Sequence, residues 1–127
     1  MASLVSTVPL ISVIDDDESL RVATSSLLRS MGYATEYFAS AEAFFDSGDT
    51  ARFACVISDI QMPGMNGIDL TQRLLASEAR SKVILMTART EQDLHARARA
   101  SGALHLLFKP FEAQQLLQWV AQALRPG

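Results

Sequence analysis

The strongest structural signal in this sequence is the segment Val56-Ile57-Ser58-Asp59-Ile60-Gln61-Met62-Pro63-Gly64-Met65-Asn66-Gly67. An uncharged apolar run, residues 53–57, leads into it, and such a short run is typical of a strand buried on both faces. Asp59 stands where the apolar run stops, and turn-forming Pro-Gly and Asn-Gly pairs follow. The pattern therefore places Asp59 at the C-terminal end of a buried strand. A carboxylate there is a metal ligand, a nucleophile or a cap for the following loop.

Length and composition indicate one compact domain. The chain has 127 residues, of which 49% are hydrophobic, enough to build a core. Its net charge of −3 argues against nucleic acid or an anionic membrane as a direct partner. Cys55 is the single cysteine, which excludes a disulfide framework and favours a cytoplasmic setting. No apolar run is long enough to span a bilayer, and the tail of residues 1–8 does not resemble a signal peptide.

The rest of the chain alternates between strand and helix patterns. Strands are predicted at 10–14, 34–38, 53–59, 82–86 and 103–108, and helices at 20–31, 40–46, 67–77, 91–101 and 113–124. Such alternation predicts an α/β fold in which helices cover both faces of a parallel sheet. We therefore expect a single doubly wound five-stranded sheet of order 2-1-3-4-5, the common order for a chain of this kind.

Polar residues follow the predicted strands at one edge of this sheet. Asp15 and Asp16 come directly after the first strand, which neighbours the third strand and its Asp59 in the expected order. Thr87 and Lys109 end the fourth and fifth strands at the same edge. Two carboxylates ~5 Å apart repel by about 3 kcal/mol at an effective dielectric near 20. A cation can cancel that repulsion, and a few hard oxygen ligands suit Mg²⁺.

A metal, an ammonium group and a hydroxyl around one carboxylate form a site for a phosphoryl group. Asp59 can then act as the nucleophile and become an aspartyl phosphate. Mg²⁺ and Lys109 would neutralise the oxygens of the transferred group, and Thr87 adds a hydrogen-bond donor.

The same residues carry a resemblance to a known family. From about residue 9 to residue 125 the chain is similar to the receiver domains of two-component response regulators, which have a flavodoxin-like fold. The carriers, in chain order, are Asp15-Asp16, the segment Asp59-Ile60-Gln61-Met62-Pro63-Gly64-Met65-Asn66-Gly67, Thr87-Ala88 and Phe108-Lys109-Pro110-Phe111. Each of these motifs is weak alone, and their joint occurrence at the correct strand ends is highly specific.

The resemblance implies a role for each site residue. Asp59 would accept phosphate from a sensor histidine kinase or a phosphotransfer protein. Asp16, Asp59 and the backbone carbonyl of Gln61 would ligate Mg²⁺ directly, with Asp15 acting through water. Thr87 and Lys109 would bind the phosphoryl oxygens.

It also implies limits on the chemistry. The domain would catalyse only its own phosphorylation and slow autodephosphorylation, and would not be an enzyme acting on other substrates. Gln61 and Arg89 would border the path of the attacking water and tune the lifetime of the phosphate.

The sequence departs from the family at one position. Family members usually carry Phe or Tyr three residues before the lysine, where this chain has Leu106. We expect Leu104, Leu106 and Phe108 to share one face of the last strand. With Trp119, we expect Leu106 and Phe108 to form an output surface over the fourth helix, fifth strand and fifth helix. That surface would serve an output domain or self-association, and we expect no output domain within these 127 residues.

Four other readings of the sequence remain open. The acidic residues could merely cap loops at the sheet edge. A Mg²⁺-dependent phosphohydrolase normally places a second Asp two residues after the nucleophile, where this chain has Gln61. A flavin-binding domain would have a Gly- and hydroxyl-rich loop after the first strand. A receiver-like interaction module would never be phosphorylated.

We expect His95 to lie on an exposed helix face.

Overall fold

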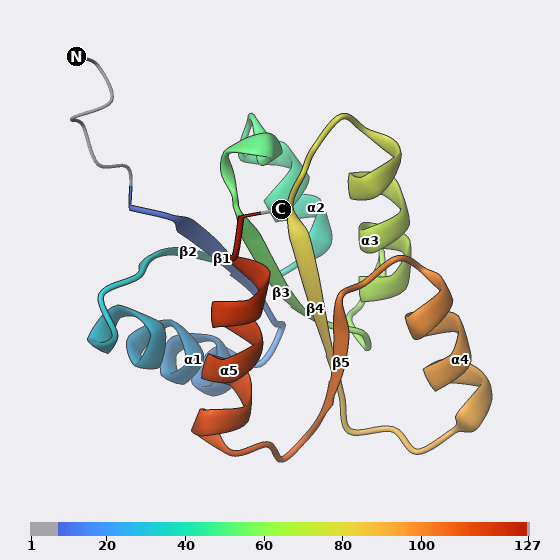
Figure 1. The fold of residues 1–127 in the computed structure, drawn as a ribbon. Coiled ribbons are helices and arrows are strands. Elements are labelled where there is room, and N and C mark those ends of the chain that lie inside the picture. Colours follow the sequence, from blue (N-terminus) through green and yellow to red (C-terminus); the bar gives the residue numbers. More distant parts are fainter. Residues whose placement is uncertain (1–7, 127) are drawn as a thin grey trace.

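The computed structural model describes residues 8–126 as five parallel strands, in the order β2-β1-β3-β4-β5, with helices between them (Figure 1). The strands are β1 (Leu10–Ile14), β2 (Ala34–Phe38), β3 (Cys55–Asp59), β4 (Lys82–Thr87) and β5 (His105–Phe108). The helices are α1 (Glu18–Ser30), α2 (Ala41–Asp46), α3 (Gly67–Ala76), α4 (Gln92–Ala100) and α5 (Ala113–Ala123), with a 3-10 turn, η2, at Thr50–Arg52. The predicted fold class and strand order are confirmed.

Two further expectations concern the N-terminal tail and membrane-spanning segments. Residues 1–7 of the predicted tail lie outside the described residues. Within residues 8–126, every helix falls short of the length and apolarity that a bilayer crossing requires.

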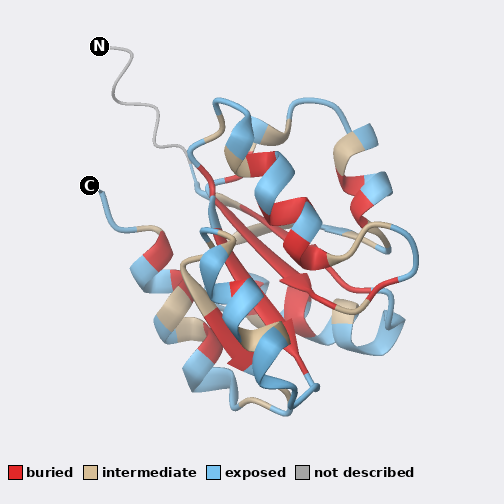
Figure 2. Cartoon of the chain, turned by 90° about the vertical axis from the view of Figure 1, so that its right-hand side faces the viewer, coloured by how far each residue is buried: buried red, intermediate tan, exposed pale blue. Residues whose placement is uncertain are grey.

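The sheet separates two hydrophobic clusters, because successive side chains of a strand point to opposite faces. Helices α2, α3 and α4 cover one face, where Phe44 and Leu74 pack against sheet residues that include Val56. Helices α1 and α5 cover the other face, where Leu28 and Val120 pack against sheet residues of the second cluster. Figure 2 shows the central strands buried between helices whose outer sides are exposed. The central strands are therefore held from both sides, as the uncharged run before Asp59 predicted.

Strand β5 is shorter than predicted, and this changes which side chains share a face. Leu106 is buried in the cluster under α2, α3 and α4, whereas Leu107 lies in the cluster under α1 and α5. Leu104 precedes the strand and packs against that second cluster. The prediction that Leu104 shares a face with Leu106 and Phe108 is therefore wrong, because regular alternation begins only at His105.

A close backbone approach fixes the loop that follows Asp59. The backbone N–H of Gly67 donates to the carbonyl oxygen of Ile60 at 3.0 Å, and Asn66 caps α3 by accepting from the backbone N–H of Asp69. A Cβ atom at position 67 would overlap the backbone carbonyl oxygen of Asp59. Only glycine therefore lets the start of α3 lie this close to the end of β3.

Candidate functional site

Three carboxylates meet at the carboxyl edge of the sheet. Ile14 of β1 pairs with Ser58 of β3, and this register sets Asp15 beside Asp59 at the strand ends. Asp15 is 1% exposed and Asp59 is 7% exposed, whereas Asp16 is exposed to solvent. One carboxylate oxygen from each of the three lies within 4.8 Å of the others. The structure thus brings together the acidic residues that the strand order predicted to converge.

Lys109 supplies a positive charge to the two buried carboxylates. Its Nζ lies 3.1 Å from Oδ2 of Asp15 and 3.4 Å from Oδ2 of Asp59. Its backbone N–H donates to the carbonyl oxygen of Thr87 at 2.7 Å, so the residue after β5 is tied to the end of β4. The ion pairs of the side chain and the hydrogen bond of the backbone therefore both hold Lys109 beside Asp59.

The Thr87 hydroxyl is buried and already has two partners. It donates to Oε1 of Gln61 at 2.9 Å and accepts from the backbone N–H of Arg89 at 3.0 Å. The guanidinium group of Arg89 instead pairs with Glu91 at 2.9 Å on the surface. Gln61 and Thr87 therefore lie in contact across the mouth of the site, and the Arg89 side chain is directed to a different partner.

The electrostatic environment of Asp59 disfavours its ionised form. Burial raises the pKa of the Asp59 carboxyl above its ordinary value, Lys109 acts in the opposite direction, and the charges of Asp15 and Asp16 raise it further. The single ammonium group does not offset burial and two neighbouring carboxylates. A bound cation would restore the balance.

The donor set fits a hard divalent cation such as Mg²⁺. Carboxylate oxygens are the ligands that Mg²⁺ prefers, and an open, solvent-facing side leaves room for the waters it retains. Asp15 is already engaged by Lys109 and by the backbone N–H of Asp17 at 3.0 Å. Asp16 is exposed and can turn toward a cation beside Asp59.

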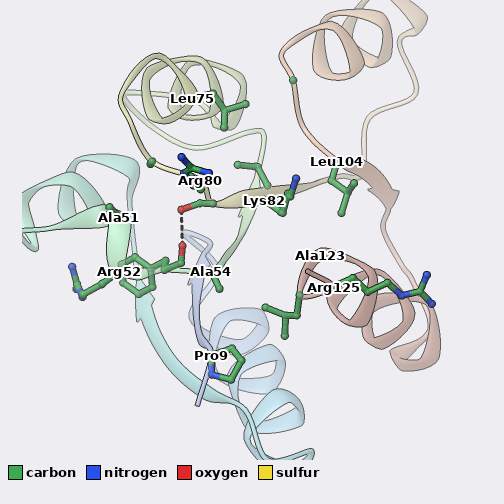
Figure 3. A pocket seen from close by; sticks show the side chains of 16 residues that line it. Pro9, Ala51, Arg52, Ala54, Leu75, Arg80, Lys82, Leu104, Ala123 and Arg125 are labelled. Carbon is green, nitrogen blue, oxygen red and sulfur yellow. Dashed lines mark hydrogen bonds between the residues drawn. The ribbon is translucent and has the colours of Figure 1, made fainter. Parts of the chain in front are cut away.

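A separate cavity lies at the amino ends of the strands. It has a volume of about 790 Å³, and its charged lining residues are Arg52, Arg80, Lys82 and Arg125 (Figure 3). Among residues 8–126 no acidic side chain lines it, and its lining includes none of the residues of the carboxylate site. The cavity is therefore separate from the carboxylate site, which is an open edge of the sheet.

Comparison with known proteins identifies the family. A family model for the response regulator receiver domain matches residues 11–121. The chain belongs to this family. Among curated relatives, the transcriptional regulatory protein FixJ of Bradyrhizobium diazoefficiens is 37% identical over 115 residues, which cover 91% of this chain and 56% of FixJ. The C4-dicarboxylate transport transcriptional regulatory protein DctD of Rhizobium meliloti is 38% identical, and the match covers 93% of this chain and 26% of DctD. The receiver domain thus spans about half or less of these relatives.

Solved structures of receiver domains agree with the fold described above. The chemotaxis protein CheY4 of Vibrio cholerae superposes with a TM-score of 0.85 at 27% identity, covering 93% of this chain and all of that one. The response regulator StyR superposes with a TM-score of 0.84 at 36% identity, covering 93% of this chain and 60% of StyR. The family and fold expected from the sequence motifs are therefore confirmed.

Two further sequence expectations about this receiver domain are wrong, one for Leu106 of β5 and one for His95 of α4. Leu106 is only 3% exposed and lies in the core, so it is not part of an exposed contact surface. His95 is half-buried, and its ring packs against Phe108 with centroids 4.8 Å apart. The helical pattern could not reveal this contact, because it places His95 on the polar side of α4 and carries no information on β5. Trp119 is half-buried and stacks on His105 at 3.6 Å, while Phe108 is exposed.

The raised pKa of Asp59 leads to a prediction about stability and pH. This pKa is higher in the folded protein than the unfolded value of about 3.9. The free energy of unfolding therefore falls as the pH rises from the unfolded pKa to the folded pKa of Asp59. Asp59→Asn removes the buried charge, so we expect the variant to exceed the parent protein in unfolding free energy at pH 7. The difference should shrink as the pH falls toward about 4.

Urea unfolding at several pH values, without divalent cations, measures this difference. Glu78→Gln removes an exposed carboxylate and serves as the control, with little change expected at pH 7. Equal stability of the Asp59→Asn variant and the parent at pH 7 would contradict the electrostatic account.

Proposed function

We propose that this receiver domain is phosphorylated on Asp59 by the phosphohistidine of a sensor histidine kinase or a phosphotransfer protein, in a Mg²⁺-dependent reaction. The observation that carries the proposal is a buried carboxylate at a strand end, 3.4 Å from a lysine ammonium and beside two further carboxylates. A loop cap needs neither the ammonium group nor the neighbouring acids. The family assignment supports the same function.

The proposed transfer uses side chains that already lie in place. A carboxylate oxygen of Asp59 forms a bond to phosphorus while the bond between phosphorus and the donor imidazole nitrogen breaks. The bonding electron pair stays on that nitrogen, which takes up a proton. Lys109 then pairs with an oxygen of the transferred group, and the Thr87 hydroxyl exchanges its bond to Gln61 for a bond to another oxygen.

Asp16, Asp59 and the backbone carbonyl of Gln61 would hold the Mg²⁺ ion, with Asp15 acting through water. Bound there, the ion supplies charge neutralisation for the phosphoryl oxygens. The exposure of Asp16 and the engagement of Asp15 by Lys109 support this division of roles. Lys109 and the cation compete for Asp59, so we expect weak cation binding.

We further propose that phosphorylation changes the surface formed by α4, β5 and α5. Phe108 is 45% exposed on this surface, and Trp119 is half-buried there. The relatives FixJ and DctD are named as transcriptional regulators and are longer than the matched region. The surface would accordingly contact an output domain or a second copy of this domain. The receiver domain itself would bind neither nucleic acid nor membrane. Because phosphohistidine donors are made from ATP, we place the protein in the cytoplasm.

Phosphorylation of Asp59 can be tested directly. Asp59→Asn removes the nucleophilic oxygen, so the protein should no longer gain the mass of a phosphoryl group when incubated with acetyl phosphate and Mg²⁺. Intact-protein mass spectrometry measures the gain. Asp69→Asn, which changes an exposed aspartate of α3, should be modified like the parent protein. Modification of the Asp59→Asn variant at the parent rate would refute the assignment.

The cation site can be tested by calorimetric titration with Mg²⁺. Asp16→Ala removes one of few direct ligands, so affinity should fall by about tenfold or more, the scale on which even outer-sphere partners of a metal matter. Glu18→Ala, an exposed acid outside the three-carboxylate group, is the control and should have a much smaller effect. Unchanged affinity in the Asp16→Ala protein would show that the cation binds elsewhere.

The residues that border the site should set the lifetime of the phosphate. We propose that Gln61 and Arg89 obstruct the attacking water, and the contact of Gln61 with Thr87 supports this for the first residue. Replacing both by Ala should speed loss of phosphate by about tenfold, equivalent to roughly 1.4 kcal/mol of barrier. The decay of phosphorylated protein after removal of the donor gives the rate. A double variant at the exposed positions Gln72 and Arg97 is the control, and decay within error of the parent would reject the idea.

A further inference from the structure

We infer that His95 is a positioning residue that connects the loop after Thr87 to the exposed ring of Phe108. Through it, a change at the Thr87 hydroxyl reaches the surface of β5. This inference rests on the proposed phosphorylation of Asp59. It assigns a role to a side chain that the phosphoryl chemistry itself does not use.

The first part of the connection is made by hydrogen bonds through Arg89. The backbone N–H of Arg89 donates to Oγ1 of Thr87 at 3.0 Å, and the carbonyl oxygen of the same residue lies 2.8 Å from Nε2 of His95. A carbonyl oxygen only accepts, so Nε2 of His95 carries the proton and donates. One peptide segment therefore links the site hydroxyl to an imidazole on α4.

The second part is an aromatic contact. The His95 ring meets the Phe108 ring edge to face, with centroids 4.8 Å apart and an interplanar angle of 61°. The Arg99 guanidinium lies 5.9 Å from the same ring centroid, so two side chains of α4 hold Phe108.

The connection closes on itself at the strand ends. Phe108 pairs with Thr87 in the register of β4 and β5, and the next residue, Lys109, donates its backbone N–H to the Thr87 carbonyl at 2.7 Å. Thr87, Arg89, His95 and Phe108 thus form a continuous ring of contacts around the start of the β4–α4 loop. A displacement of the Thr87 hydroxyl changes the position of both neighbours in this ring.

The aliphatic residue at position 106 makes this connection the more direct route to the surface. Leu106 is 3% exposed and packs in the core, where it offers neither a ring nor a hydrogen bond to the loop. The rings connected to the loop by the contacts above are those of His95, bonded to Arg89, and Phe108, packed on His95. If the rings of His95 and Phe108 merely pack together, the environment of Phe108 should not change when the phosphoryl site is occupied. The proposed connection predicts that it does change, so the two explanations differ in a measurable way.

Fluorine NMR of the full chain, with phenylalanines replaced by 4-fluorophenylalanine, reads this response. The Phe108 signal is identified by its absence in Phe108→Leu, and beryllofluoride with Mg²⁺ serves as the phosphoryl mimic. We expect the mimic to shift the Phe108 signal of the parent protein. In His95→Ala the shift should fall to the size seen for the core residues Phe44 and Phe53. In His95→Gln, which keeps a donor for Arg89 without the ring, it should also be reduced.

The affinity for the mimic is a second readout. Coupling between sites is reciprocal, and losing the connection leaves a looser loop to be ordered by the mimic. We therefore expect His95→Ala to lower affinity by about fivefold, the low end of typical couplings. The control Gln92→Ala, at an exposed position of the same helix, should change neither the affinity nor the Phe108 shift.

The outcomes separate this inference from the proposed function. Binding of the mimic with the same Phe108 shift in His95→Ala as in the parent overturns the role of His95 and leaves phosphorylation of Asp59 intact. Binding without any Phe108 shift in the parent overturns it as well. Failure of the mimic to bind the parent protein overturns the proposed function and, with it, this inference.

Discussion

The chemistry of the site depends on a carboxylate that is held where water cannot fully solvate it. Asp59 is 7% exposed and lies beside Asp15, so burial and repulsion both favour its neutral form. Lys109, 3.4 Å away, is the only cationic side chain within ion-pairing distance of it among residues 8–126. One ammonium group shared by two buried carboxylates leaves negative charge in excess. That excess favours the binding of a cation, on which the proposed phosphorylation would depend.

The fold supports this arrangement through backbone contacts. The parallel register of β1 and β3 sets Asp15 beside Asp59, and the hydrogen bond from Lys109 to the Thr87 carbonyl fixes the lysine after β5. Gly67 lets α3 begin against the Asp59 carbonyl. The large apolar clusters on both faces of the sheet stabilise these strands. An electrostatically unfavourable edge is thereby tolerated, since burial of apolar area is the dominant stabilising contribution to folding.

Much of this could be predicted from sequence, because the relevant signals are local. An apolar run that stops at Asp59 marks a strand end, and strand–helix alternation then determines which strand ends are neighbours. The contacts of His95 and Leu104 could not be predicted in this way. Helical periodicity assigns a face and not a partner, and the strand pattern around Leu104 extends beyond the point where β5 begins. Sequence reasoning thus succeeded at the strand ends and failed where two elements distant in sequence pack side by side.

The distance between the buried chemistry and the surface is set by the sheet itself. Thr87 and Phe108 pair across neighbouring strands, yet the threonine is buried and the phenylalanine is 45% exposed. The Thr87 hydroxyl cannot keep its bond to Gln61 and also bind a phosphoryl oxygen with its single proton. The proposed phosphorylation would therefore break an existing hydrogen bond, one strand away from an exposed ring. A receiver domain with an aliphatic residue at position 106 can accordingly transmit its state over a short path, provided that the β4–α4 loop is attached to that ring.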